Sequence, residues 1–87
     1  MFDEKKLVLM PQEQEGSYKF DSKPYMTSGF LEEFGDNAAL IVAYGLQRIR
    51  HTYWDNCDYF QVMKYKGKKF YVIDDSDHLT FLLPSEY

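Results

Sequence analysis

The amino-acid sequence predicts an α+β domain in which a small antiparallel sheet packs one face against one central helix. Two stretches lead to this prediction. Residues 58–75 alternate as paired strands do, and residues 37–50 carry apolar side chains at helical spacing. Shorter apolar runs complete an expected order of β-β-α-β-β-β. At 87 residues the chain has the length of one domain, which we place at residues 1–87.

Residues 58–75, DYFQVMKYKGKKFYVIDD, predict a β-hairpin. In the first arm Phe60, Val62 and Lys64 share one side, and the residues between them share the other. The second arm is rich in aromatic and β-branched residues, which favour strands. Gly67 can adopt the positive φ that a short reversal requires, and the lysines around it keep the tip in water.

The central helix is expected at about residues 37–50, after Asp36 as its N-cap. Gly45 lies inside the apolar stripe, where glycine is unfavourable for a helix, so we expect a strand to approach closely there. At 100° per residue the stripe comprises Ala38, Ile41, Val42, Gly45, Leu46 and Ile49.

The residues before the helix are predicted to contribute two strands. Residues 7–10 read as an edge strand that ends at Pro11, which cannot donate to a ladder. Residues 11–24 are polar and lack periodicity, so we expect a mobile loop. Residues 25–28 are expected to form the second strand, closing at Gly29.

Two further elements flank the helix and the hairpin. Residues 30–34 have the spacing of a single helical turn. Residues 78–83 alternate as a last strand, which Pro84 ends.

Composition and charge restrict the class of protein. The net charge of −4 argues against general affinity for nucleic acid, because phosphate binding requires clustered Lys and Arg. Cys57 is the single cysteine, so no intrachain disulfide can form, and we expect a cytoplasmic protein. The apolar runs are shorter than the ~18–20 residues that span a bilayer, so no membrane association is expected.

Two polar groups could carry chemistry. Residues 74–78, Asp-Asp-Ser-Asp-His, could hold a divalent cation or form a tight turn, and they lack the spacing of a calcium loop. Cys57 and His51 could be drawn as a pair, but the flanking aspartates oppose a reactive thiolate. We therefore expect no metal, no cofactor and no enzymatic activity.

One candidate contact surface lies before and along the helix. Leu40 and Tyr44 fall outside the apolar stripe and are neighbours at i,i+4. Either the loop at 11–24 covers them, or they contact another chain. In the second case they join nearby carboxylates in a partner-binding set of Glu32, Glu33, Asp36, Leu40 and Tyr44.

The alternative site is basic and aromatic. Lysines between positions 64 and 69 and arginines at the helix end alternate with tyrosines, which is typical of platforms for single-stranded nucleic acid. Lysines at a hairpin tip also serve to protect strand edges from aggregation. The alternative set is Arg48, Arg50, Lys64, Tyr65, Lys66 and Tyr71.

Residues 25–87 resemble an uncharacterised family of short bacterial, plasmid or phage proteins, a domain of unknown function. Its members have a threonine-x-glycine turn, a helix, an aspartate-led hairpin with a glycine tip, and a leucine-threonine strand ending in Glu-Tyr. The residues between Asp74 and Leu79 are fewer here than in that pattern. The resemblance implies only a phage or mobile-element setting. Its motifs stand at residues 26–30, 57–62, 66–70, 73–74 and 79–87.

These features favour a small acidic module that binds another protein. Aromatic residues make up 18% of the chain, more than a core of this size can use, so some rings must lie at the surface. We expect a phage- or plasmid-encoded protein acting on a host protein, as an inhibitor or a mimic of nucleic acid. The alternative is a nucleic-acid-binding module. In either case a homodimer through an unpaired edge strand stays open.

Overall fold

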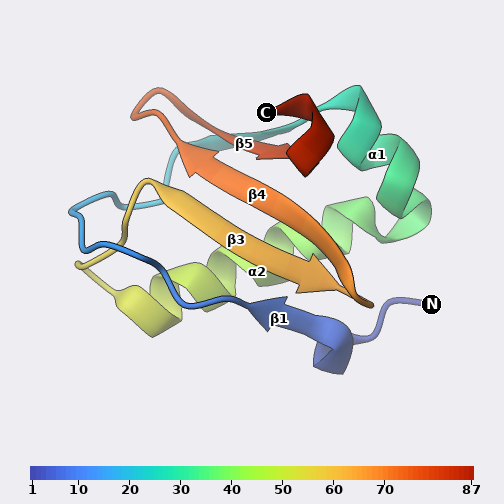
Figure 1. The fold of residues 1–87 in the computed structure, drawn as a ribbon, viewed down its shortest axis with the longest axis horizontal. Helices are drawn as coiled ribbons and strands as arrows, with labels where there is room; N and C mark the ends of the chain where they lie inside the picture. The colour runs from blue at the N-terminus through green and yellow to red at the C-terminus, as the bar shows by residue number, and fades with distance from the viewer.

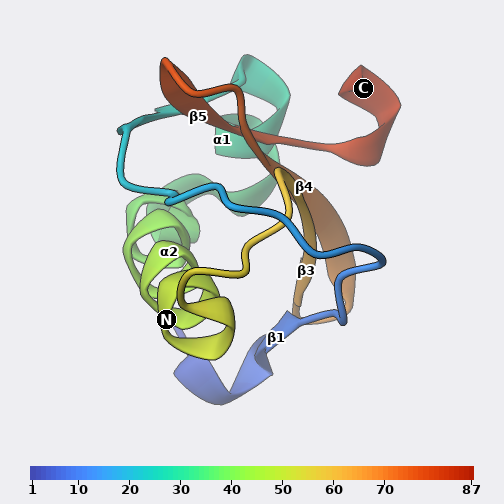
Figure 2. The ribbon, with the colours of Figure 1, turned by 90° about the vertical axis from the view of Figure 1, so that its left-hand side faces the viewer.

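The computed structural model describes residues 1–87 and has two layers, a five-stranded sheet and a helical layer on one face of it (Figures 1 and 2). This confirms the predicted fold class. The spatial order of the strands is β1-β3-β4-β5-β2. The strands are β1 (Leu7–Leu9), β2 (Lys23–Met26), β3 (Phe60–Tyr65), β4 (Lys68–Asp74) and β5 (His78–Leu82).

The sheet is mixed, whereas the sequence led us to expect antiparallel pairing throughout. β1, β3, β4 and β5 pair antiparallel, but β2 runs parallel to β5. The whole helical layer separates β2 from β3 in sequence, so β2 is free to enter at the far edge of the sheet. The alternation of apolar and polar residues within a strand shows which of its faces is buried. It does not show whether the neighbouring strand runs parallel or antiparallel to it.

The hairpin of β3 and β4 matches its prediction. Lys66 and Gly67 form the reversal with φ of 51° and 83°, the pair of positive values that a two-residue type I′ turn requires. Gln61, Met63 and Tyr65 are buried toward the helices. Their alternates on β3 point to the opposite side of the sheet.

Helix α2 (Ala38–Tyr53) is the predicted central helix, three residues longer at its C-terminus. The predicted stripe faces the sheet, and all of it is buried except the half-buried Val42. Asp36 is not the N-cap. It lies in the 3-10 turn η2 (Gly35–Asn37), so the residue that precedes α2 is Asn37, which makes no side-chain capping bond. No helix has the length and apolar character needed to cross a membrane.

The strand expected at 25–28 is present as β2 (Lys23–Met26), two residues earlier and so partly within the expected loop at 11–24, and a second helix, α1 (Ser28–Phe34), follows it. Thr27 is its N-cap, because its Oγ1 accepts a hydrogen bond from Phe30 N at 3.1 Å. The strand therefore ends at Met26, and Gly29 lies in the first helical turn. The expected turn at 30–34 belongs to this helix, which buries Phe30 and Phe34 against the sheet.

The segment 11–24 is tied to the rest of the fold at several points. Gly16 N and Tyr18 N donate to Asn56 O and Cys57 O at 3.3 and 3.0 Å. Phe20 is fully buried, and its N–H donates to the Asp74 carboxylate at 3.0 Å. The mobility of this loop stays a prediction. The contacts at Gly16, Tyr18 and Phe20 limit any such mobility to the residues between them.

We predict that Gly45→Leu lowers the free energy of unfolding by about 1–3 kcal/mol, the usual cost of overpacking a core. A Cβ at Gly45 would lie 3.3 Å from Met63 Sδ and 3.7 Å from Phe81 Cε2, so a larger side chain would push α2 off the sheet. Urea denaturation measures the effect. Ala43→Leu on the exposed side of the same helix is the control, and equal losses in both variants would contradict the prediction.

Candidate functional site

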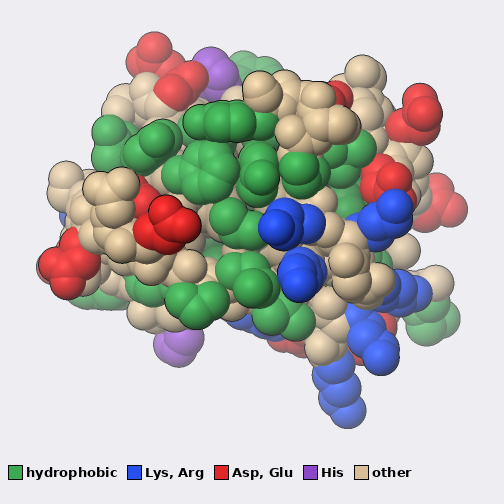
Figure 3. Space-filling model, in the orientation of Figure 1, with side chains coloured by type: hydrophobic (Ala, Val, Ile, Leu, Met, Phe, Trp, Pro, Cys, Tyr) green, Lys and Arg blue, Asp and Glu red, His purple; other side chains and the backbone are tan.

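The side of the sheet that faces away from α1 and α2, here called the outer face, has no α-helix over it (Figure 2). Figure 3 shows hydrophobic side chains gathered across its middle, bordered by Lys and Arg side chains near the β3–β4 turn. Most of its side chains are half-buried. Three central strands contribute them: Phe60, Val62 and Lys64 from β3, Lys69, Tyr71 and Ile73 from β4, and Thr80 and Leu82 from β5.

An aromatic cluster occupies the centre of the outer face. The rings of Phe60 and Tyr71 lie 4.8 Å apart, and Tyr87 packs against both, at 5.4 and 5.7 Å between ring centroids. Tyr87 follows the 3-10 turn η3 (Pro84–Glu86), which carries it back over the sheet, and it stays 71% exposed. The cluster is therefore stable within the chain and still presents aromatic surface to solvent.

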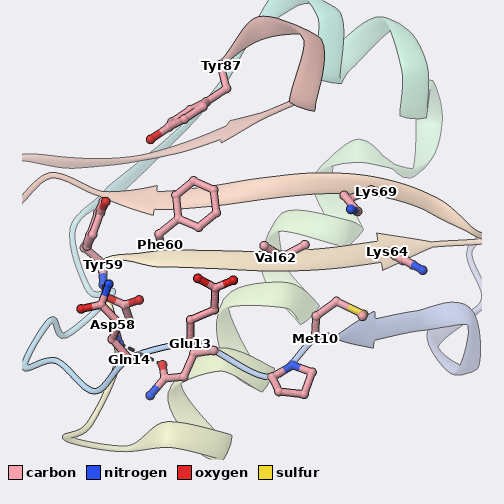
Figure 4. A pocket seen from close by; sticks show the side chains of 12 residues that line it. Met10, Glu13, Gln14, Asp58, Tyr59, Phe60, Val62, Lys64, Lys69 and Tyr87 are labelled. Atoms are coloured by element: carbon pink, nitrogen blue, oxygen red, sulfur yellow. Dashed lines mark hydrogen bonds between the residues drawn. The ribbon is translucent and has the colours of Figure 1, made fainter.

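A groove of about 460 Å³ runs along the outer face beside this cluster (Figure 4). Its floor is formed by β3, and residues 10–14 and Tyr87 rise on opposite sides of it. The lining residues are Met10, Pro11, Gln12, Glu13, Gln14, Asp58, Tyr59, Phe60, Val62, Lys64, Lys69 and Tyr87.

Gln12 holds one wall of the groove in place. Its Oε1 accepts hydrogen bonds from Asp58 N at 2.9 Å and from Gln61 Nε2 at 2.8 Å. Its Nε2 donates to Asn56 O, and its backbone N–H donates to the Tyr53 hydroxyl, both at 2.9 Å. Four bonds from one residue thus fix a segment that has no secondary structure of its own.

Glu86 holds the other wall. Its carboxylate accepts hydrogen bonds from Thr27 Oγ1 at 2.6 Å, Leu83 N at 2.9 Å and Gly29 N at 3.2 Å. The bond from Thr27, followed by those from Leu83 and Gly29, lowers the pKa of Glu86. A Cβ at Gly29 would overlap this carboxylate, so a larger residue there would displace the Glu86 side chain. The contact joins η3, and with it the position of Tyr87, to the N-terminus of α1.

Unpaired charges stand at the two ends of the groove. Lys64 and Lys69 are direct cross-strand partners near the hairpin turn. Glu13 extends from the loop toward β3 near Phe60, at the opposite end (Figure 4). None of the three belongs to an ion pair, since the salt bridges of the structure join other residues.

The predicted partner-binding set lies in the helical layer, away from the groove. Glu32 and Glu33 are exposed on α1, and Glu33 pairs with Lys68 at 3.8 Å. Asp36 is exposed in η2. Leu40 and Tyr44 are 45% and 36% exposed on α2. The ring that packs on Tyr44 is Phe2, at 5.1 Å, and not a residue of the loop at 11–24.

The predicted basic set does not form one surface. The Arg48 guanidinium donates to Leu7 O and lies 3.6 Å from Glu4, and Arg50 Nε donates to Phe20 O at 2.6 Å. Tyr65 is 2% exposed, and its hydroxyl accepts a bond from Asp3 N at 2.8 Å. Lys66 lies at the hairpin tip. Lys64 and Tyr71 alone share the outer face.

The carboxylates of the polar cluster at 74–78 accept hydrogen bonds that stabilise the turn between β4 and β5. Asp74 accepts from Phe20 N and Ser76 N, at 3.0 and 2.8 Å. Asp75 accepts from the N–H groups of His78 and Asp77, which lower its pKa, the His78 bond most strongly. No three metal-ligating side chains converge in the structure.

Cys57 is fully buried, with Sγ 3.8 Å from Ile49 O and 3.7 Å from Trp54 O. Burial, and then the charge of Asp74, raise the pKa of this thiol, so it stays protonated near neutral pH. The absence of enzymatic activity remains an expectation.

No family model, curated protein or solved structure matches the chain. Sequence reasoning did not identify the groove. The alternation that put Phe60, Val62 and Lys64 on one side of β3 was the available signal. Nothing in the local pattern showed that this side has no cover, or that Glu13 and Tyr87 lie beside it.

We predict that Glu86→Gln lowers the midpoint of thermal unfolding near neutral pH, because the amide cannot replace the charged acceptor. The folded-state pKa of Glu86 lies below its ordinary value of 4.5, so the carboxylate's contribution is present above that pH and is lost as pH falls through the folded-state pKa. The gap between variant and wild type should therefore narrow in acid.

Thermal unfolding followed by circular dichroism across this pH range measures the gap. Glu15→Gln, at an exposed carboxylate, serves as the control and should leave the midpoint unchanged. A gap for Glu86→Gln that does not vary with pH would contradict the prediction.

Proposed function

We propose that this protein is a small protein-interaction module that contacts its partner through the outer face of its sheet. The observation that carries the proposal is the aromatic and aliphatic centre of that face, which neither α-helix covers. In a two-layer α+β fold, the second face of an antiparallel sheet is usually polar because it meets water. An apolar centre with a groove is instead typical of an interaction site.

The side chains around the groove suit a protein partner. Tyr, Phe and Met are enriched in protein interfaces, and the aromatic rings bury much area at a small entropic cost. Phe60 and Tyr87 supply such rings, and Met10 and Val62 complete the apolar lining. The charged groups Glu13, Lys64 and Lys69 lie at the margins, where they would orient a partner.

The partner-binding set predicted from the sequence offers a second surface for the same function. Glu32, Glu33 and Asp36 could present carboxylates to a basic groove of a host protein, as an inhibitor or mimic of nucleic acid would, with Leu40 and Tyr44 beside them. Its two apolar members leave a narrow apolar strip on α2. We favour the outer face because its apolar side chains are contiguous over three strands.

A homodimer by strand addition is disfavoured at both edges of the sheet. Pro24 lies within β2 and has no N–H to donate, and on β1 the N–H of Leu7 already donates to Glu4 O. Leu7 O on the outer edge of β1 already accepts from Arg48.

We predict that a photoreactive p-benzoylphenylalanine at position 71 forms one discrete protein adduct in cells that produce the chain, whereas the same group at position 44 does not. Tyr71 lies in the outer face, and Tyr44 lies on the opposite side in α2. Mass spectrometry of the adducts measures the outcome.

Charge reversal separates a specific adduct from incidental labelling. Lys64→Glu with Lys69→Glu should abolish the position-71 adduct, and Lys5→Glu with Lys66→Glu, which gives the same net charge, should preserve it. An adduct formed from position 44 and not from position 71 would show that the partner binds the helical layer and not the outer face. No discrete adduct from either position would overturn the proposed function.

A second candidate function is the binding of single-stranded nucleic acid on the same face. Lys64 and Lys69 stand beside stacked rings on an open sheet, an arrangement used for phosphates and bases. The candidate is weaker because Glu13 and a net charge of −4 would repel a polyanion.

Fluorescence anisotropy with a short labelled single-stranded oligonucleotide distinguishes the two functions. The interaction-module proposal expects no binding at high micromolar protein and low salt. Binding that weakens with salt, and that Lys64→Glu with Lys69→Glu removes, would instead establish the nucleic-acid function.

A further inference from the structure

The cross-strand pair of Lys64 and Lys69 is an unfavourable feature that the chain itself does not compensate. Tyr59 and Asp74 form a hydrogen-bonded position of the β3–β4 ladder, so by alternation Lys64 and Lys69 form a non-hydrogen-bonded pair. Side chains approach most closely at such positions, and like charges directly opposite are destabilising. Neither ammonium group has a carboxylate within ion-pairing distance. The pair therefore favours a carboxylate supplied by another molecule.

Glu13 is the matching charge at the other end of the groove. It points into the groove beside Phe60 and takes part in no ion pair (Figure 4). Phe60 and Lys64 are four residues apart on β3, so the two charged ends are separated by roughly 13 Å along the strand. Val62 and the aromatic cluster lie between them.

An apolar surface with a positive pair at one end and a negative group at the other is complementary to itself. Rotation by 180° about an axis that lies parallel to the sheet and across the groove near Val62 turns the second copy face to face with the first. It would bring Glu13 of one copy over Lys64 and Lys69 of the other. Such twofold contacts use the same patch on both subunits and close after two copies. A linear polyanion would instead meet repulsion at the Glu13 end.

We propose that the partner of the outer face is a second copy of this chain, bound sheet to sheet around a twofold axis. This inference rests on the proposed function and names the partner for that same surface. The two aromatic clusters pack against each other at the centre, and Glu13 pairs with the lysines of the other copy at both ends. The helical layers lie outermost, which leaves Leu40 and Tyr44 exposed in the dimer.

The outer face has the dimensions of a standard protein interface. It is the broad side of the molecule, whose longer extents are 32 and 25 Å, and Figure 1 looks straight onto it. A contact over the whole of this side would cover at most roughly 800 Å² per copy, the size of a standard interface.

Sedimentation velocity over a range of protein concentrations tests this inference with charge-swapped variants. Wild type should form dimers reversibly. Glu13→Lys makes all three groups positive, and Lys64→Glu with Lys69→Glu makes all three negative. Each variant alone should dimerise at least about tenfold more weakly, because like charges then meet at both ends. An equimolar mixture of the two should form a heterodimer with affinity near that of wild type.

Lys5→Glu with Lys66→Glu is the control for net charge and should dimerise as wild type does. Circular dichroism and the unfolding midpoint verify that each variant is folded. The inference would be overturned if the chain stays monomeric at millimolar concentration. It would also be overturned if the charge-swapped variants dimerise with the same affinity as wild type. If the chain is monomeric and position 71 still crosslinks to a different protein, the proposed function stands and the second-copy partner is wrong.

Discussion

The packing of α2 on the inner side of the sheet is the contact on which the rest of the structure depends. Gly45 lets the helix approach Met63 and Phe81, and the buried stripe on either side fills the space between the layers. Burying each large apolar side chain stabilises the fold by roughly 1.5–3 kcal/mol, so this single layer of contacts supplies much of the stability of so small a domain. Because α1 packs on the same side, both helices are used there and the outer face stays open.

Two polar residues hold the irregular segments that border the outer face in place through hydrogen bonds. Gln12 joins the loop after β1 to the connection between α2 and β3. Glu86 joins η3 to the start of α1, and its carboxylate sits where the helix dipole favours negative charge. Segments far apart in sequence are thereby fixed beside one another, and the groove they border has a defined shape in the isolated chain.

The outer face breaks two rules that a purely structural surface would obey. Aromatic rings stand where water-facing strands usually carry polar side chains, and two lysines face each other without a counter-ion. Departures of this kind tend to mark functional sites, because the folded chain alone gains nothing from them. A partner that covers the rings and supplies carboxylates would relieve both at once.

The sequence by itself determined the local elements: the alternation in β3, the glycine-tipped hairpin, and the stripe with Gly45 at its centre all match the structure. These features depend on residues close together in the chain, where periodicity and turn geometry are enough. Tertiary structure alone decided that β2 runs parallel to β5, that Arg48 and Arg50 bond to backbone carbonyls, and that Glu13 and Tyr87 meet β3. These outcomes depend on which distant segments share the space around one sheet, and no spacing along the chain encodes that.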